Sequence, residues 1–178
     1  MRLIAFIVCL FLCFFVSSCA PKLPPHEAGY GMVAVPFQTI NRTTYPIIRT
    51  VVLKSSTDAS FSITVSDPPL NSGIVLSEPI SQGSYLVDYY EVKAVPVSQI
   101  NDSLSSQPIK FDRPLKITID DGEISLLPIG FTVEQYTQSD TIYCNLRTLP
   151  LDGTMHNKYS EKLMQMENSD MWRVKTIE

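Results

Sequence analysis

Short runs of alternating apolar and polar residues constrain the fold of this chain more than any other feature of its sequence. In residues 59–67 (ASFSITVSD), every second residue from Phe61 to Val65 is apolar, and residues 114–120 (PLKITID) repeat the pattern. A period of two places the apolar side chains on one face of a β-strand and the polar ones on the other. Both segments therefore predict strands that bury one face and leave the other in solvent.

Turn signals connect these segments to further strands. Asp121 and Gly122 follow directly after the second run, and this pair suits a tight hairpin because glycine tolerates positive φ. We expect residues 123–129 to return as the partner strand of that hairpin. The other expected strands are 31–38, 46–54, 73–76, 84–95 and the pair 130–136 and 140–148.

The first of these segments, residues 31–38 (GMVAVPFQ), is apolar on both faces and contains Pro36. Because proline cannot donate a ladder hydrogen bond, this composition predicts an edge strand or a bulge at Pro36. About eight to nine strands, with turn signals every 8–12 residues, predict a mainly β fold in the form of an antiparallel β-sandwich. A small barrel is the alternative.

The pattern changes to a helical period near the C-terminus. Four apolar residues spaced by four, four and three form one helical face: Met155, Tyr159, Leu163 and Met166. We expect one amphipathic helix at about 155–167, capped by Thr154 and packed on the sandwich. Residues 171–177 (MWRVKTI) would form a last short strand or pack Trp172 against the helix.

The first eighteen residues have the composition of a secretory signal. Arg2 supplies a positive charge, residues 3–16 carry none, and small residues follow. Fourteen helical residues cover about 21 Å, less than the roughly 30 Å of a bilayer's hydrocarbon core. A cleaved signal peptide at residues 1–18 is therefore favoured over a membrane-spanning helix.

Residues Val16-Ser17-Ser18-Cys19 resemble the lipobox of bacterial lipoproteins, in which an aliphatic residue and two small residues precede a cysteine. The resemblance implies cleavage before Cys19, diacylglycerol on its sulfur and an acylated amino group, so that membrane lipid anchors the chain in the cell envelope. In a cell with two membranes it implies the outer membrane, because Ala20 rather than aspartate follows. An ordinary signal peptide followed by a free cysteine is the alternative.

The residues after Cys19 predict a spacer. Residues 20–28 (APKLPPHEA) contain three prolines and favour extended polyproline II, which would hold the next domain up to roughly 28 Å from the lipid. A histidine in such a spacer, His26, is expected to be solvated. The expected organisation is a signal peptide at 1–18, a lipidated cysteine and tether at 19–28, and one β-sandwich domain at 29–178.

Charge and cysteine content narrow the functional classes. Loss of Arg2 with the signal leaves thirteen basic and eighteen acidic residues, a net charge of about −5, without a basic run. This balance disfavours nucleic-acid binding, which depends on the neutralisation of phosphates. Cys144 is the free cysteine that remains, and we expect it in the core, without a disulfide, a metal site or a cofactor.

The sequence contains no recognisable catalytic motif, and we expect no enzyme activity. For His156, a surface position is favoured over the role of a catalytic base. Asp120, Asp121 and Glu123 form an acidic cluster of a kind that holds calcium or serves acid–base chemistry. They bracket the expected turn, where Asp and Gly are favoured for backbone reasons, and the turn interpretation is preferred.

Three tyrosines are the candidate binding residues. In residues 85–90 (YLVDYY), a strand would place Tyr85 and Tyr89 on one face and Tyr90 on the other. Aromatic side chains exposed on a sheet stack on sugars, peptides or a partner protein. An aromatic stripe on the core face would instead be ordinary packing.

The chain resembles the small β-sandwich domains of bacterial envelope lipoproteins at six positions: Gly83, Tyr85, Gly122, Ile124, Leu127 and Gly130. Prealbumin-like sandwich domains share the Gly-x-Tyr feature of this pattern. Leu126 replaces an aromatic residue of that pattern, and Pro128-Ile129 is inserted. Such a resemblance implies a fold and not an activity. The expected function is a non-enzymatic, lipid-anchored envelope component that binds another envelope protein or takes part in envelope assembly. The alternative is a surface module that binds carbohydrate or peptide through the tyrosine strand.

Overall fold

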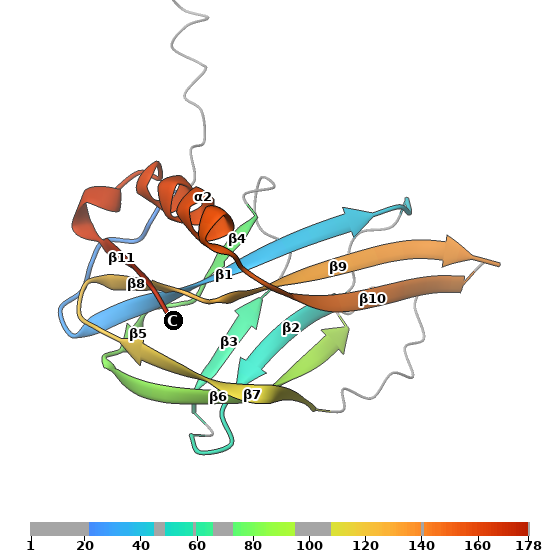
Figure 1. The fold of residues 1–178 in the computed structure, drawn as a ribbon, viewed down its shortest axis with the longest axis horizontal. Helices are drawn as coiled ribbons and strands as arrows, with labels where there is room; N and C mark the ends of the chain where they lie inside the picture. The colour runs from blue at the N-terminus through green and yellow to red at the C-terminus, as the bar shows by residue number, and fades with distance from the viewer. Residues whose placement is uncertain are drawn as a thin grey trace, which may run out of the picture.

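The computed structural model describes residues 22–44, 49–58, 60–65, 73–94, 108–139 and 141–177. Across these ranges, eleven strands form two sheets that pack face to face, and one α-helix lies on the outer side of the larger sheet (Figure 1). The mainly β, two-sheet architecture and the C-terminal helix expected from the sequence are confirmed. No helix in these ranges is long and apolar enough to cross a bilayer.

The larger sheet is built around β1 (Tyr30–Asn41) and has the order β10–β9–β1–β8–β11, with β4 and β5 also paired to β1. Its other strands are β4 (Ile74–Leu76), β5 (Ile80–Ser81), β8 (Glu123–Leu126), β9 (Ile129–Gln138), β10 (Thr141–Pro150) and β11 (Arg173–Thr176). β1 runs parallel to β8 and β9, and β11 runs parallel to β8. The sheet is therefore mixed, whereas a wholly antiparallel one was expected.

The smaller sheet has the order β3–β2–β6–β7 and is antiparallel throughout. Its strands are β2 (Arg49–Lys54), β3 (Ser62–Val65), β6 (Gly83–Ala94) and β7 (Ile109–Ile119). It forms the lower layer in Figure 1. The two segments with the clearest alternation in the sequence, 59–67 and 114–120, contain β3 and the end of β7, so both strand predictions are confirmed.

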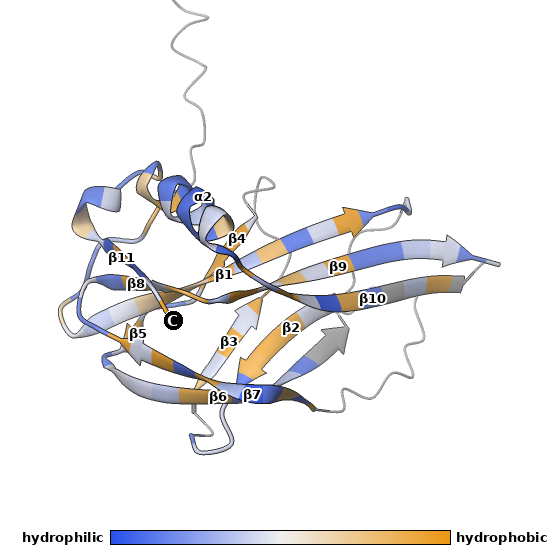
Figure 2. Cartoon of the chain, viewed as in Figure 1, coloured by the Kyte–Doolittle hydropathy of each residue, from blue (hydrophilic) through white to orange (hydrophobic). Residues whose placement is uncertain are grey.

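Apolar side chains form two cores, one on each side of the larger sheet. Val33, Val35 and Phe37 of β1 face the smaller sheet in the main core. Met32 and Ala34 face the other way, into a second core under α2 (Gly153–Met164). β1 is buried on both faces, and a strand in that position is expected to be continuously apolar. Figure 2 shows apolar residues concentrated in β2 and the neighbouring strands, whereas α2 presents mainly polar residues to the viewer.

Pro36 lies in a central strand, so the edge-strand alternative is wrong. β1 pairs with β8 up to Ala34 and with β9 from Phe37 onward, and Pro36 lies at the step between the two pairings. The chain opposite spans that step from Leu126 to Phe131, which is two residues longer than the step on β1. The ladder on this side is thus interrupted where Pro36 has no N–H to donate, and the two extra residues lie in the opposite chain, between β8 and β9, rather than at Pro36.

The expected turn at Asp121-Gly122 is present, but the hairpin is not. Gly122 has a φ of +67°, and the Glu123 N–H donates to the Asp120 carbonyl at 3.2 Å. β7 nevertheless pairs with β6 in the smaller sheet, whereas β8 pairs with β1 and β11 in the larger one. The turn therefore carries the chain from one layer to the other. The second expected pair, β9 with β10, is confirmed as antiparallel.

The C-terminal helix begins at Gly153, two residues earlier than a cap at Thr154 would allow. The Asp152 carboxylate accepts a hydrogen bond from the Met155 N–H at 2.8 Å and is the N-cap. Leu163 is fully buried in the second core beside Trp172. β11 follows directly after Trp172, so both expectations for the last residues hold.

Candidate functional site

From Lys22 onward, the expected spacer is part of the folded domain. Leu23 is 1% exposed and belongs to the second core. Its N–H donates to the Glu167 carbonyl at 2.9 Å, and the indole Nε1 of Trp172 donates to the Pro24 carbonyl at 2.9 Å. The spacer prediction is therefore wrong for these residues. Cys19, the expected lipidation site, lies outside the described residues.

Asp121 holds the end of this N-terminal segment. Its Oδ1 accepts the Gly29 N–H at 2.6 Å and lies 3.0 Å from Nε2 of His26. The Gly29 hydrogen bond first, and the His26 contact second, hold the pKa of Asp121 below its ordinary value. The His26 ring is partly buried and meets Trp172 edge-on at 5.4 Å between centroids. His26 is thus a structural residue rather than a solvated one.

The other two acidic residues hold the C-terminal strand. Asp120 Oδ2 lies 2.7 Å from Lys175 Nζ, which lowers the pKa of Asp120 and raises that of Lys175. Glu123 Oε1 lies 3.6 Å from Arg173. Asp120, Asp121 and Glu123 therefore join the two ends of the domain at one turn. Within the described ranges, no group of three or more His, Cys, Asp or Glu side chains is arranged to hold a metal ion.

The three candidate tyrosines do not form one exposed surface. The register of β6 shifts between Val87 and Tyr89, and this irregularity changes which side chains face the core. Tyr85 stacks on Phe61 at 4.4 Å, and Tyr90 also packs on the main core. The expected placement of Tyr90 opposite Tyr85 is therefore wrong.

Tyr90 and Tyr89 differ in their surroundings. The Tyr90 ring lies 5.2 Å from that of Phe111 and 5.7 Å from that of Phe131, and burial raises the pKa of its hydroxyl. Tyr89 is partly buried and is paired in register with Lys54 and Lys110. Of the three tyrosines, Tyr90 contributes most clearly to the packing between the sheets.

His156 and Cys144 were the other two residues whose side chains the sequence analysis considered for chemistry. His156 is partly buried on α2, and its Nδ1 is buried without a hydrogen-bond partner among the residues described. The backbone of Cys144 lies in β10 opposite Gln135. Its side chain is not among those that the structure describes, so the expected core position of Cys144 lies outside the described part. Its neighbour Tyr143 is exposed and stacks on Tyr136 at 5.5 Å.

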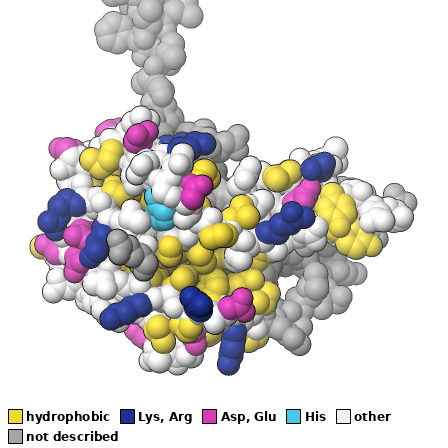
Figure 3. All heavy atoms as spheres, in the orientation of Figure 1, with side chains coloured by type: hydrophobic (Ala, Val, Ile, Leu, Met, Phe, Trp, Pro, Cys, Tyr) yellow, Lys and Arg dark blue, Asp and Glu magenta, His cyan; other side chains and the backbone are white. Residues whose placement is uncertain are grey.

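In Figure 3, apolar side chains gather below α2 and again towards the tip of β9 and β10.

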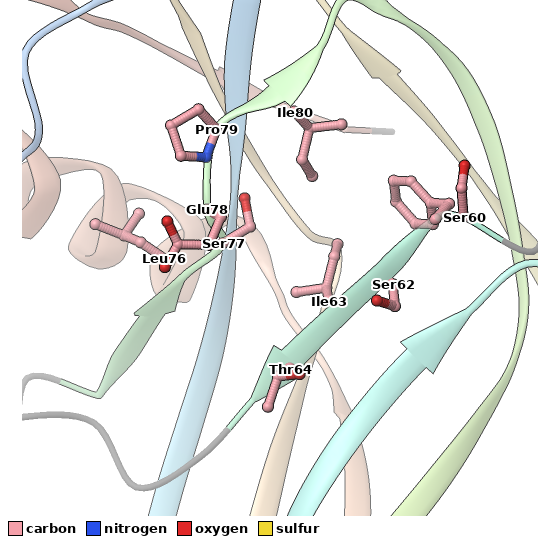
Figure 4. Close-up of a pocket in the computed structure, with 10 residues that line it drawn as sticks. Ser60, Ser62, Ile63, Thr64, Leu76, Ser77, Glu78, Pro79 and Ile80 are labelled. Carbon is pink, nitrogen blue, oxygen red and sulfur yellow. The ribbon is translucent and has the colours of Figure 1, made fainter.

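A hollow of about 420 Å³ opens between β3 and the segment that joins β4 to β5 (Figure 4). Its lining is Ser60, Phe61, Ser62, Ile63, Thr64, Leu76, Ser77, Glu78, Pro79 and Ile80. Phe61 and Ile63 are buried and form its apolar floor, whereas Ser62 and Thr64 are exposed. Tyr85 does not line the hollow, but its ring stacks on that of Phe61 in the floor.

The two walls of the hollow are held differently. On one side, Ser77 is fixed to β1, since its Oγ accepts from the Val33 N–H and its own N–H donates to the Val33 carbonyl, both at 2.9 Å. On the other side, β3 is the terminal strand of its sheet and is paired, among the described strands, with β2 alone. A terminal strand presents backbone N–H and C=O groups that another strand can pair with. The hollow is therefore suited to an extended chain that lies along β3.

Sequence reasoning missed this hollow. The alternation in 59–67 marked β3 as a strand with one wet face, but it carries no information on whether the strand is central or terminal. Residues 77–80 (SEPI) were not assigned to any element, although Pro79, just after the expected strand 73–76, is a sign of an interrupted strand.

The described geometry defines a mixed β-sandwich whose larger sheet has a helix-covered second core. Comparisons with protein-family models, with curated proteins and with solved structures found no match for this chain.

Proposed function

We propose that this chain is a lipid-anchored, non-enzymatic component of the cell envelope, and that it binds an extended segment of another envelope protein along β3. The anchor is proposed from the resemblance of Val16-Ser17-Ser18-Cys19 to a lipobox. Two or more acyl chains give stable membrane attachment.

The observation that carries the binding proposal is the terminal strand β3 beside the 420 Å³ hollow. A strand added to a sheet edge gains main-chain hydrogen bonds, and pockets for alternate side chains give it specificity. The floor of Phe61 and Ile63 supplies such a pocket, and the exposed hydroxyls of Ser62 and Thr64 supply polar contacts. Binding is favoured over catalysis because Glu78 is the one ionisable side chain in this lining.

The alternative, a carbohydrate- or peptide-binding surface on the tyrosine strand, has weaker support. It needs Tyr85, Tyr89 and Tyr90 free to stack on a ligand. Tyr85 is occupied by its stack on Phe61, and Tyr90 by its contacts with Phe111 and Phe131.

Metabolic labelling with a palmitate analogue tests the anchor. We expect the unaltered chain to incorporate label and to fractionate with membranes, and Cys19→Ser to lose the label. Cys13→Ser is the matched control, because it removes a cysteine inside the proposed signal, and it should keep the label. Equal labelling of the Cys19→Ser and unaltered chains would refute lipidation at this residue.

Site-specific photo-crosslinking in intact cells tests the binding site. A photoreactive amino acid at Ser62 or Thr64 should yield an adduct of discrete mass, whereas the same residue at Lys158, exposed on α2, should not. Peptide mapping of the adduct should locate the cross-link in an extended segment of the partner. The proposal fails if positions 62 and 64 give no adduct, or if position 158 gives the same one.

A further inference from the structure

The packing of residues 22–28 determines which end of the domain lies nearest the proposed anchor. Cys19 lies three residues before Lys22, and because consecutive Cα atoms are about 3.8 Å apart, the two Cα atoms can be no more than about 11 Å apart. The headgroup layer on one side of a bilayer is about 5–8 Å thick. A chain lipidated at Cys19 therefore keeps Lys22 within the headgroup layer or only a few ångström beyond it, and the roughly 28 Å of the expected spacer is not available.

Lys22 is fixed to the turn between α2 and the short 3-10 helix η2 (Ser169–Met171). Its Nζ lies 2.8 Å from Oε1 of Glu167, and the two backbones form an isolated β-bridge. Figure 1 shows the start of the described chain, in blue, beside this turn. The α2–η2 turn, residues 164–171, thus lies at the anchored end of the domain.

Two large apolar side chains are exposed on this turn. Met164 is 49% exposed and Met171 is 48% exposed. The Ser169 hydroxyl donates to the Met164 carbonyl at 2.7 Å, which ties the start of η2 to the end of α2. Between them, Met166 is buried in the second core, so the turn is firmly attached to the domain. Methionine adapts to irregular apolar surroundings because its side chain is unbranched and polarisable.

A second apolar feature lies at the same end. A hollow of about 490 Å³ is lined by Lys22, Leu23, Pro24, Pro25, Met32 and residues 76–79. It starts at Lys22, the residue that the anchor brings to the lipid. Lys22 therefore belongs both to the ion pair on the α2–η2 turn and to the lining of this hollow.

We propose that the α2–η2 turn rests on the surface of the bilayer, with Met164 and Met171 at the boundary between headgroups and acyl chains. This inference rests on the proposed lipidation of Cys19. Cys19 lies only three residues before Lys22, and Lys22 contacts the turn, so the anchoring bilayer is the surface nearest to the turn. Lys22 neutralises Glu167 at the centre of the turn, and Asp170 remains an exposed carboxylate. The contact accordingly suits zwitterionic lipid better than strongly anionic lipid.

Methionine oxidation measures this contact directly. The purified lipidated chain carrying Ile109→Met is reconstituted in vesicles of phosphatidylethanolamine and phosphatidylglycerol and treated with hydrogen peroxide, and each methionine is followed by mass spectrometry. Ile109 is 44% exposed on β7, in the layer that faces away from α2, so it is a matched reference for Met164 and Met171. We expect both native methionines to be oxidised at least fivefold more slowly than the reference. In the Cys19→Ser chain that begins at residue 19, without vesicles, the three rates should be similar.

Three outcomes overturn the inference, and they are distinguishable. Equal rates in vesicles, while the chain remains bound to them, would refute the bilayer contact and leave the lipid anchor intact. Protection in native membranes but not in pure vesicles would assign the turn to a protein partner instead. Failure of palmitate labelling at Cys19 would remove the premise itself.

Discussion

The indole nitrogen of Trp172 donates a hydrogen bond of 2.9 Å to the main-chain oxygen of Pro24, 148 residues earlier in the sequence. Asn168 makes the equivalent bond from its side-chain nitrogen to the Leu23 carbonyl at 3.0 Å. The first described residues and the last thus close the second core together. A segment with the composition of a spacer is therefore part of the folded domain, and we expect it to contribute to the stability of that domain.

Leu23→Ala measures that requirement. The Leu23 side chain is buried in the second core, and truncation of a buried leucine costs about 2–5 kcal/mol in the free energy of unfolding. Pro25→Ala is the matched control because Pro25 is exposed in the same segment, and it should change the unfolding free energy by less than about 0.5 kcal/mol. Urea denaturation of both variants gives the comparison. Similar values for the two would mean that the segment does behave as a spacer.

Gly31→Ala tests the close approach of β1 to the turn that links the sheets. A Cβ at Gly31 would lie 2.5 Å from the Asp120 carbonyl oxygen and 2.9 Å from that of Glu123. Because both obstacles are backbone atoms, we expect a loss of about 1–3 kcal/mol or more. Gly153→Ala, where nothing lies within 4 Å of the added atom, should be neutral or stabilising by up to about 1 kcal/mol. Thermal unfolding should give a lower midpoint for Gly31→Ala and an unchanged or higher midpoint for Gly153→Ala, and an unchanged midpoint for Gly31→Ala would contradict the geometry.

Local chemistry predicted the turn at Asp121-Gly122 but not the pairing of the two strands that it joins. A tight turn needs only a residue that accepts positive φ, and the pair Asp121-Gly122 meets that requirement by itself. Whether the flanking strands pair with each other depends on their partners, and β8 takes β1 and β11 as parallel neighbours. Those neighbours are distant in sequence, so no local pattern identifies them.

Periodicity was sufficient where a strand is regular and buried on one face, as at Ile63 and Ile117. It failed at the tyrosines because the register of β6 shifts after Val87, and a strict period of two then assigns Tyr90 to the wrong face. It failed at Leu23 for a different reason. A single apolar residue among prolines has no period, and its burial depends on Trp172 and Met166 at the other end of the chain.

Tyr90→Ala and Tyr89→Ala separate packing from binding on β6. Tyr90 contacts Phe111 and Phe131 in the main core, and loss of a large core aromatic costs about 3–5 kcal/mol when burial is complete, so a partly buried ring should cost somewhat less. Tyr89 is absent from both apolar cores, and its variant should lose less stability than the Tyr90 variant. Chemical denaturation ranks them, and the reverse order would mean that the alternation in the sequence describes the strand better than the register shift does.

The structure and the sequence pattern name different N-cap residues for α2, Asp152 and Thr154. Asp152 accepts the Met155 N–H at 2.8 Å, and replacement of a capping residue by alanine costs about 0.5–2 kcal/mol. Asp152→Ala should therefore lower the unfolding free energy by about 1 kcal/mol. Thr154→Ala should have almost no effect, because Thr154 lies inside the helix and is exposed. A larger loss for Thr154→Ala would restore the cap that the sequence suggested.

The Asp121 contacts predict a loss of stability in acid. The hydrogen bond from the Gly29 N–H, and to a smaller extent the contact with His26, lower the pKa of Asp121 below its ordinary value of 3.8. A carboxylate whose pKa is lower in the folded state contributes stability above its unfolded pKa, and the contribution is lost as the pH falls through the folded value. The packing of the N-terminal segment should therefore weaken below about pH 4. Asp121→Asn should be less stable than the unaltered chain at neutral pH and should lose less on acidification.

Urea midpoints measured at intervals from about pH 7 to about pH 2 check this. The difference between the unaltered chain and Asp121→Asn should be constant above the unfolded pKa and should shrink as the pH falls below it. His26→Gln is the informative control because it keeps the larger contribution, the Gly29 hydrogen bond, and should retain most of the acid dependence. If the Asp121→Asn midpoints run parallel to those of the unaltered chain throughout, Asp121 does not couple the N-terminal segment to the turn.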